Sequence, residues 1–152
     1  MRTTRLLTIL LAAGVLSAGA TAEAACTIST TAVNFGSYNV FSASPDDATG
    51  QITYRCTAPR PPLVTIQLDK GGAPTFNPRR MLKGSEILNY NLYLDSTRST
   101  IWGDGTGGSQ TYTRSSPPTN TNINVSVFGR IPAGQDVSAG SYSATVTATI
   151  FF

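Results

Sequence analysis

Residues 140–152, with the sequence GSYSATVTATIFF, decide the fold predicted for this chain. Alternate residues of an extended strand point to opposite faces, so one face here is mostly apolar and the other is mostly Ser and Thr. The apolar face comprises Tyr142, Ala144, Val146, Ala148, Ile150 and Phe152. Because the segment holds no proline and no charged side chain, an exposed edge here would attract another strand. We therefore expect a half-buried strand that needs a pairing partner, from this chain or from another.

The first 24 residues have the pattern of a secretory signal sequence. Two arginines precede an apolar run at residues 6–16, and Ala-Glu-Ala at residues 22–24 forms a small-x-small cleavage site. The sequence therefore predicts export, with residues 1–24 removed and one domain spanning residues 25–152. No later stretch approaches the roughly eighteen uninterrupted apolar residues of a membrane span, so no transmembrane segment is expected.

The composition excludes several classes of function. The formal net charge is +3 and only 12% of the residues are charged, which is too little and too scattered to indicate binding of nucleic acid. The chain has no histidine, the usual base for a serine or cysteine nucleophile, and its acidic residues show no spacing typical of a carboxylate pair. The sequence therefore predicts neither an enzyme nor a cofactor or metal site.

The chain contains two cysteines, Cys26 and Cys56. An exported protein meets an oxidising compartment, so the two are expected to form one disulfide. The alternatives are a metal site and a catalytic thiol, but two cysteines without histidine do not complete a zinc shell. A bridge that closes a loop of this length stabilises a small domain by about 3–4 kcal/mol.

The mature chain is a series of short alternating runs separated by glycine and proline turns, with no helical period. A loop is expected over residues 42–50, where Pro45 and two aspartates occur. Strands are expected over residues 26–35, 51–56, 63–69, 79–82, 87–95, 111–113, 123–128 and 140–152. The run at 79–82 is expected at an edge, and the run at 87–95 at the centre of a sheet. This number of short strands predicts an all-β fold, a sandwich or a barrel.

Several short motifs also occur along the chain in a distinctive order. They are Cys26 near the mature start, Asn34-Phe35-Gly36, Ile52-Thr53-Tyr54 before the second cysteine, Arg80-Met81-Leu82, LNYNLYLD at residues 88–95, Trp102-Gly103, GRIPAGQ at residues 129–135, and Gly140-Ser141-Tyr142 before an apolar end. This ordered set resembles the spore coat protein U family, which includes subunits of archaic chaperone–usher pili. Many members carry an acidic residue two positions after the tyrosine, where this chain has Ala144.

The resemblance implies an immunoglobulin-like β-sandwich that lacks its final strand, which leaves an apolar groove beside residues 140–152. In that family a periplasmic chaperone fills the groove first, and an N-terminal extension of a neighbouring subunit replaces it at an outer-membrane usher. Backbone hydrogen bonds then supply affinity, and alternate side chains set the register. The groove would include Val146, Ala148 and Ile150, and the C-terminal carboxylate beside Phe152 would be the handle for basic chaperone residues.

The same resemblance bears on the position of the subunit in an assembly. A subunit that extends a polymer needs about ten alternating residues before its first strand to serve as donor. Only Ala25 would precede Cys26 after the predicted cleavage. We therefore expect a subunit that accepts a strand but does not donate one, at the tip of a fibre or in a secreted coat, delivered through the periplasm to the cell surface.

A second hypothesis is a self-contained secreted β-sandwich that binds carbohydrate through its loops. Tyr90, Tyr93 and Trp102 could stack on sugar rings, although tyrosines on a central strand more often pack in the core. The glycine-rich residues 102–108, which include Asp104, could also be read as a calcium or phosphate loop. They lack the regular spacing of oxygen ligands, so a flexible turn is the simpler interpretation.

Four apolar residues in predicted loops are candidates for adhesion to a surface or to a glycan receptor. They are Val40, Phe41, Phe76 and Trp102. Exposed apolar side chains at loop tips would contact another surface, whereas the alternative is packing beneath the loops as small satellite clusters. The sequence leaves both interpretations open.

Overall fold

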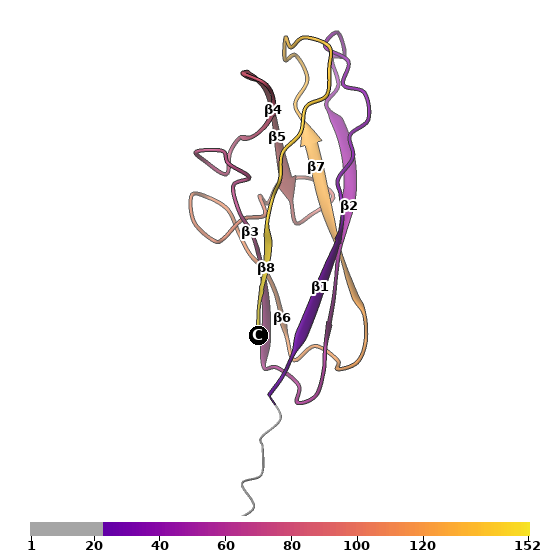
Figure 1. Ribbon diagram of the computed structural model, residues 1–152, viewed down its shortest axis with the longest axis vertical. Helices are drawn as coiled ribbons and strands as arrows, with labels where there is room; N and C mark the ends of the chain where they lie inside the picture. The colour runs from indigo at the N-terminus through magenta and orange to yellow at the C-terminus, as the bar shows by residue number, and fades with distance from the viewer. Residues whose placement is uncertain (1–22) are drawn as a thin grey trace, which may run out of the picture.

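The computed structural model describes residues 23–152, and β-strands make up all the regular secondary structure in that range (Figure 1). The strands are β1 (Cys26–Thr31), β2 (Asp46–Cys56), β3 (Leu63–Leu68), β4 (Arg79–Lys83), β5 (Glu86–Tyr93), β6 (Tyr112–Ser115), β7 (Ile123–Ile131) and β8 (Ala148–Phe151). The predicted signal sequence falls almost wholly outside the described residues. The all-β fold expected from the short alternating runs is confirmed.

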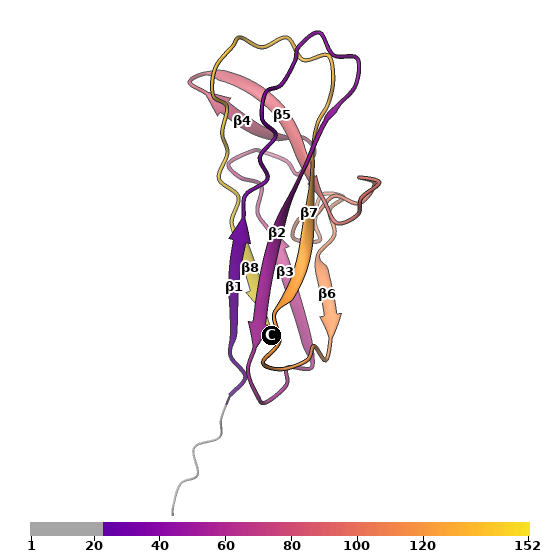
Figure 2. The same ribbon diagram turned by 90° about the vertical axis from the view of Figure 1, so that its right-hand side faces the viewer.

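The strands form two antiparallel sheets that face each other as a sandwich. One sheet has five strands in the order β1-β2-β7-β5-β4, and the other has three in the order β6-β3-β8. Figure 2 shows β1, β2 and β7 in front of β8, β3 and β6. In both figures the C-terminus lies at the same end of the sandwich as the start of β1. The sequence correctly predicted that β5 is a central strand and that β4 lies at an edge.

Alternate residues of the longer strands fill the space between the sheets. The buried apolar side chains include Ile52, Tyr54, Cys56, Val64, Ile66, Leu68, Leu88, Tyr90, Leu92, Ile123, Val127 and Ile131. Their spacing of two residues is the one that places one face of a strand in a core. Full burial of each such aliphatic side chain contributes about 1.5–3 kcal/mol, so this layer holds the two sheets together.

A disulfide joins Cys26 and Cys56, with their Cα atoms 4.0 Å apart. The two residues are direct partners at one end of the β1–β2 ladder. The bridge therefore holds the edge strand β1 on β2, and the predicted pairing is confirmed. Because both sulfur atoms are bonded to each other, neither residue is a free thiol or a metal ligand.

β2 begins at Asp46, well before the predicted start at residue 51. The reason is that the charge of Asp47 is paired across the sheet with its register partner Arg130, whose Nε and Nη2 donate to the carboxylate at 2.7 and 2.8 Å. These hydrogen bonds, together with the charges of Arg130 and Arg98, hold the pKa of Asp47 below its usual value. Residue types that usually form turns can thus extend a ladder when their charges are satisfied across it.

The last segment does not form the single strand predicted over residues 140–152. Ser143 pairs with Leu82 at the edge of the five-stranded sheet, and β8 then pairs with β3 in the other sheet. The segment between these two points crosses from one sheet to the other. Its residues therefore cannot belong to one continuous ladder, and regular strand geometry is confined to the end of the chain.

Candidate functional site

One edge of each sheet is unpaired on the same side of the sandwich. β8 pairs with β3 alone, and β1 pairs with β2 alone. Among residues 23–152, no strand covers the other edge of either one. A free edge exposes a row of N–H and C=O groups that can pair with a further strand.

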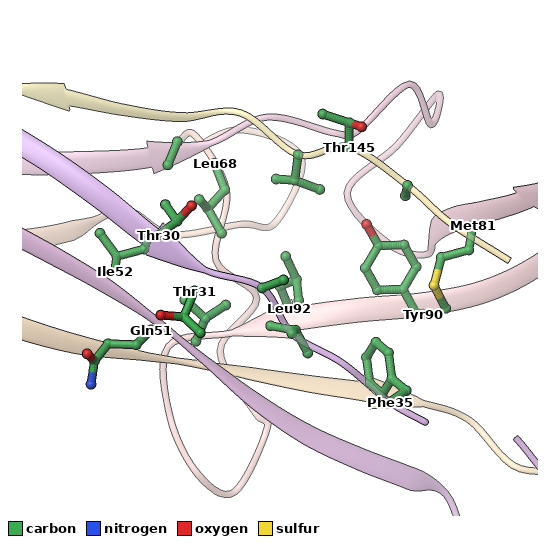
Figure 3. Close-up of a pocket in the computed structure, with 16 residues that line it drawn as sticks. Thr30, Thr31, Phe35, Gln51, Ile52, Leu68, Met81, Tyr90, Leu92 and Thr145 are labelled. Carbon is green, nitrogen blue, oxygen red and sulfur yellow. The ribbon is translucent and has the colours of Figure 1, made fainter. Parts of the chain in front are cut away.

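A cavity of about 390 Å³ lies between these two edges, and we call it the groove. One wall is formed by residues 30–35 and the other by residues 144–148. The floor consists of core side chains that reach the opening, namely Ile52, Leu68, Met81, Tyr90, Leu92 and Val127. Figure 3 shows Ile52 and Leu68 toward one end, Leu92 in the middle, and Tyr90 with Met81 and Phe35 toward the other.

The first wall depends on two glycines of the five-stranded sheet. A Cβ at Gly50 would lie 2.8 Å from Cγ2 of Val33, and a Cβ at Gly129 would lie 2.7 Å from Cζ of Phe35. The absence of side chains at these positions therefore lets residues 32–35 rest directly on β2 and β7. Residues 32–35 make no backbone hydrogen bond to another described residue. This wall is held by its side chains, so its backbone groups remain available.

The second wall is attached at two points. The amide of Leu82 donates to the carbonyl of Ser143 at 2.9 Å, and the amide of Ser143 donates to the carbonyl of Leu82 at 3.1 Å. Further along, the amide of Asp69 donates to the carbonyl of Thr147 at 3.0 Å. Residues 144–146 lie between these attachments and form no backbone hydrogen bond within the described chain. Both walls thus present unpaired backbone groups beside an apolar floor.

The residues predicted to line the groove are divided between three environments. Ala144, Val146 and Ala148 line it directly. Ile150 is half-buried against the core beyond its end, and Phe152 is 51% exposed at the C-terminus. Tyr142 lines an adjoining cavity of about 780 Å³ that shares wall and floor residues with the groove. The face predicted from the sequence is therefore only partly continuous, because the segment changes sheets.

Sequence reasoning missed the first wall and most of the floor. Residues 32–35 were expected to continue the first strand, and the signal for a different role was the change after residue 31 from hydroxyl residues to Val33 and Phe35. The sequence predicts Tyr90 and Leu92 on a central strand and Met81 on a short edge strand. Their approach to an opening depends on the packing of the two sheets, which no single stretch of sequence specifies.

Tyr142 connects the loop before the last segment to the β4–β5 hairpin. Its hydroxyl donates to Oε2 of Glu86, and the hydroxyl of Ser138 donates to Oε1 of Glu86 at 2.8 Å. The Nζ atom of Lys83 lies 3.7 Å from the same carboxylate. The hydrogen bonds from Tyr142 and Ser138, with the charge of Lys83, lower the pKa of Glu86 to about 2. This cluster fixes the point at which the second wall begins.

Two of the proposed adhesive residues are buried, which corrects that interpretation for them. Trp102 is 0% exposed and its Nε1 donates to the carbonyl of Ile66 at 3.0 Å, while Phe76 is 2% exposed beneath Arg79. Phe76 follows the alternative of packing beneath the loops, whereas Trp102 belongs to the central core. Phe41, by contrast, is 94% exposed at a loop tip, and Val40 beside it is half-buried. Among the four candidates, the loop of Val40 and Phe41 is the one that offers an exposed apolar contact.

The burial of Trp102 also removes the proposed stacking platform for sugars. Tyr90 is 5% exposed and Tyr93 is half-buried, so the three rings do not form an open stacking face. The glycine-rich loop uses its acidic group internally, since Oδ1 of Asp104 accepts hydrogen bonds from the amide and the hydroxyl of Thr106. Within the described range, no group of three or more His, Cys, Asp or Glu residues is placed to hold a metal ion. That range also contains no helix long and apolar enough to cross a membrane.

The fold defines a class of protein, the antiparallel β-sandwiches whose two sheets leave an open position between their edges. The sequence matches the Spore Coat Protein U domain over residues 12–149, and the chain belongs to that family. It is similar to Protein U of Myxococcus xanthus, with 32% identity over 152 residues that cover 90% of this chain and 83% of the relative. The resemblance found in the sequence is confirmed.

Among solved structures, the chain is similar to one in the CsuC–CsuE chaperone–tip adhesion subunit pre-assembly complex from the archaic chaperone–usher Csu pili of Acinetobacter baumannii. The TM-score is 0.57 and the identity is 25%. The match covers 85% of this chain but 40% of that one, so this chain spans less than half of its length. The family and the fold are those of structural coat and pilus subunits rather than of enzymes.

Proposed function

We propose that this protein is a secreted structural subunit of a chaperone–usher fibre or coat, and that a strand from another polypeptide fills its groove. The observation that carries the proposal is the combination of an apolar floor with two walls whose backbone groups are unpaired, at residues 32–35 and 144–146. A strand placed between them would gain hydrogen bonds on both sides and would bury alternate side chains. Backbone hydrogen bonds and buried alternate side chains are the two contributions that strand addition uses for affinity and specificity.

Three partners follow from this proposal. A periplasmic chaperone occupies the groove during export, an outer-membrane usher receives the complex, and a neighbouring subunit supplies the final strand. The likeness to a chain of a chaperone–subunit complex supports the first of these. The C-terminal carboxylate lies at the open end of β8, beside the half-exposed Phe152, where basic residues of a chaperone could reach it. The assembled protein would lie at the cell surface.

We further propose that the subunit is terminal, accepting a strand without donating one. The support is the predicted cleavage after Ala24, which leaves one residue before Cys26. The exposed Phe41 would then be available at the tip for contact with a surface. Mass spectrometry of the exported protein tests this role. An N-terminus at Ala25 agrees with it, and an extension long enough to serve as a donor would contradict it.

The central proposal is tested by expressing the mature chain in the periplasm in three forms. The first is the unmodified chain, the second carries a flexible linker and an alternating apolar strand after Phe152, and the third carries the same extension with aspartate at every inward position. We expect the second form alone to accumulate as a monomer, as judged by gel filtration, because only it fills the groove. A stable monomer from the unmodified chain, with amides of residues 144–151 protected from hydrogen exchange, would contradict the proposal.

A further inference from the structure

The floor of the groove is apolar except for one hydroxyl group. Ile52, Leu68, Leu92 and Val127 present only hydrocarbon, and Met81 adds a thioether. Tyr90 lines the same floor, and in Figure 3 its hydroxyl is directed toward the wall that contains Thr145. The other polar side chains that line the groove lie in its walls, at Thr30, Thr31 and Thr145, or beside Ile52 on β2, at Gln51. Near the end where Tyr90 lies, an occupant strand would therefore meet the Tyr90 hydroxyl as the one hydrogen-bonding side-chain atom of the floor.

The hydroxyl of Tyr90 has no hydrogen-bond partner among the described residues, although the residue is only 5% exposed. Arg79, its register partner on β4, directs its N–H groups elsewhere, to the carbonyls of Asp69 and Trp102 and to Oδ1 of Asn91. Burial raises the pKa of Tyr90, so the hydroxyl remains a neutral donor at ordinary pH. At present only solvent entering the groove can pair with it.

The ring of Tyr90 has little freedom to turn its hydroxyl away. Phe35 packs against it edge-on, with ring centroids 6.2 Å apart. On the far side, a Cβ at Gly71 would lie 3.6 Å from the hydroxyl oxygen, so the backbone turn at Gly71 limits movement of the ring in that direction. The hydroxyl therefore keeps its position when the groove is filled.

Filling the groove removes the solvent on which this hydroxyl depends. An unpaired buried donor lowers stability by an amount equivalent to roughly fivefold to a hundredfold in an equilibrium constant. An occupant with an aliphatic side chain over Tyr90 would incur that loss. An occupant with a hydroxyl or amide side chain there would avoid it, because both groups would be paired.

We infer that Tyr90 determines which strand the groove accepts, by requiring a Ser, Thr or Asn side chain at the inward position over it and aliphatic side chains at the inward positions over Ile52 and Leu92. This inference rests on the proposed function. Successive inward positions of an extended strand are about 7 Å apart, which is also the spacing of Leu92 and Tyr90 along β5. The partner is thus an extended segment with two aliphatic inward residues followed by a polar one, in a strand antiparallel to β8.

The test uses the chain with a linker and a donor strand fused after Phe152, which fixes the direction of the donor antiparallel to β8. Such a donor passes Ile52 first and Tyr90 last. Its third inward residue, which lies over Tyr90, is either Val or Thr, two side chains of nearly the same shape. Each of the two donors is fused to the wild-type chain and to the Y90F variant, which gives four proteins. Urea denaturation gives the four unfolding equilibrium constants, and the result of interest is the Thr-to-Val ratio in each background.

We expect Y90F to lower the Thr-to-Val ratio by about tenfold, because the threonine hydroxyl loses its partner while the valine donor gains from removal of the unpaired one. An unchanged ratio would overturn the inference, since it would mean that the Tyr90 hydroxyl is satisfied within the chain. A second measurement needs no change at Tyr90. In the wild-type chain, a donor with Thr at its first inward position, over Ile52, should stabilise the chain less than a donor with Val there. If the Thr-to-Val ratio were the same over Ile52 as over Tyr90, the inference would also be overturned.

The proposed function fails in a distinguishable way. If no donor, with Val or with Thr, stabilises the chain relative to the donor with aspartate at its inward positions, the groove does not accept a strand and both proposals fall. If the Val and Thr donors stabilise the chain equally in both backgrounds, strand acceptance stands and only the role of Tyr90 is overturned.

Discussion

Asp69 and Thr147 are joined by hydrogen bonds in both directions. The amide of Asp69 donates to the carbonyl of Thr147 at 3.0 Å, and the amide of Thr147 donates to Oδ1 of Asp69 at 3.0 Å. A side-chain oxygen thus takes the place of the backbone carbonyl that a regular ladder would supply. The same Oδ1 accepts the amide of Gly71 at 2.9 Å. Asp69 therefore extends the β3–β8 ladder by one contact and fixes the point where the second wall of the groove, after crossing from the other sheet, reaches β3.

Replacement of Asp69 should loosen this wall. D69A removes the acceptor for the amides of Thr147 and Gly71, and we expect a loss of about 1–2 kcal/mol in the free energy of unfolding. D69N is the matched control, because its amide oxygen keeps the acceptor at the same position. Urea denaturation of the chain with a fused donor strand measures both. Equal stability of D69A and D69N would show that these hydrogen bonds do not hold the wall.

Arg79 is a buried cation, 0% exposed, that donates to the carbonyls of Asp69 and Trp102 and to the side chain of Asn91. R79M would keep much of the side-chain volume but leave these buried oxygens without a donor, so we expect a loss of about 2–4 kcal/mol. R80M on the next residue is the control, because Arg80 is half-exposed, and it should change stability by less than about 0.5 kcal/mol. Thermal and urea unfolding should rank the variants in this order.

The disulfide should account for a large part of the stability. Cys26 and Cys56 are 30 residues apart in the sequence, and a closed loop of this length corresponds to about 3–4 kcal/mol. We expect the double variant C26S/C56S to lose that amount and to release β1 from the edge of its sheet. Hydrogen exchange measured by mass spectrometry would then rise first in residues 26–35. Exchange that rises first in β5 instead would contradict this order of events.

The cluster around Glu86 predicts a dependence of stability on acid. Its pKa is lowered from 4.5 to about 2, chiefly by the hydrogen bonds from Tyr142 and Ser138. A carboxyl whose pKa is lower in the folded state stabilises the fold above its unfolded pKa, and this contribution is lost as the pH falls from about 5 toward 2. E86Q should therefore show a shallower decline in urea midpoint over that range than the wild type. Y142F should give an intermediate slope, and parallel curves for all three proteins would exclude the effect.

The strands and the disulfide could be predicted from the sequence because their signals are local. The alternation of Ile52, Tyr54 and Cys56 is visible within one short run. The two cysteines of an exported chain can form an intrachain disulfide only with each other. The start of β2 was missed because Asp46 and Asp47 favour a loop by themselves. Only the pairing of Asp47 with Arg130, which is distant in sequence, reveals that the ladder continues.

The groove could be predicted only in outline. The unpaired C-terminal strand follows from its composition, but its change of sheet depends on Leu82 and Asp69, which no pattern within residues 140–152 indicates. Trp102 was misplaced for a similar reason, because its glycine-rich neighbours suggest an exposed turn. Its ring is instead buried and hydrogen-bonded to the carbonyl of Ile66. In each case the deciding partner is more than ten residues away, so local propensity had no access to it.

The bridge between Cys26 and Cys56 also governs how the molecule would bear tension. A strand gripped between the two walls would transmit a pull to β1, which as an edge strand could be peeled away one hydrogen bond after another. The covalent link ties the first residue of β1 to the last residue of β2, which is paired on both sides. The bridge prevents β1 from separating from β2 at that end. The force would then act as shear along the length of the interior strand β2. A small domain with few charges would thereby gain mechanical strength that its thermodynamic stability alone does not measure.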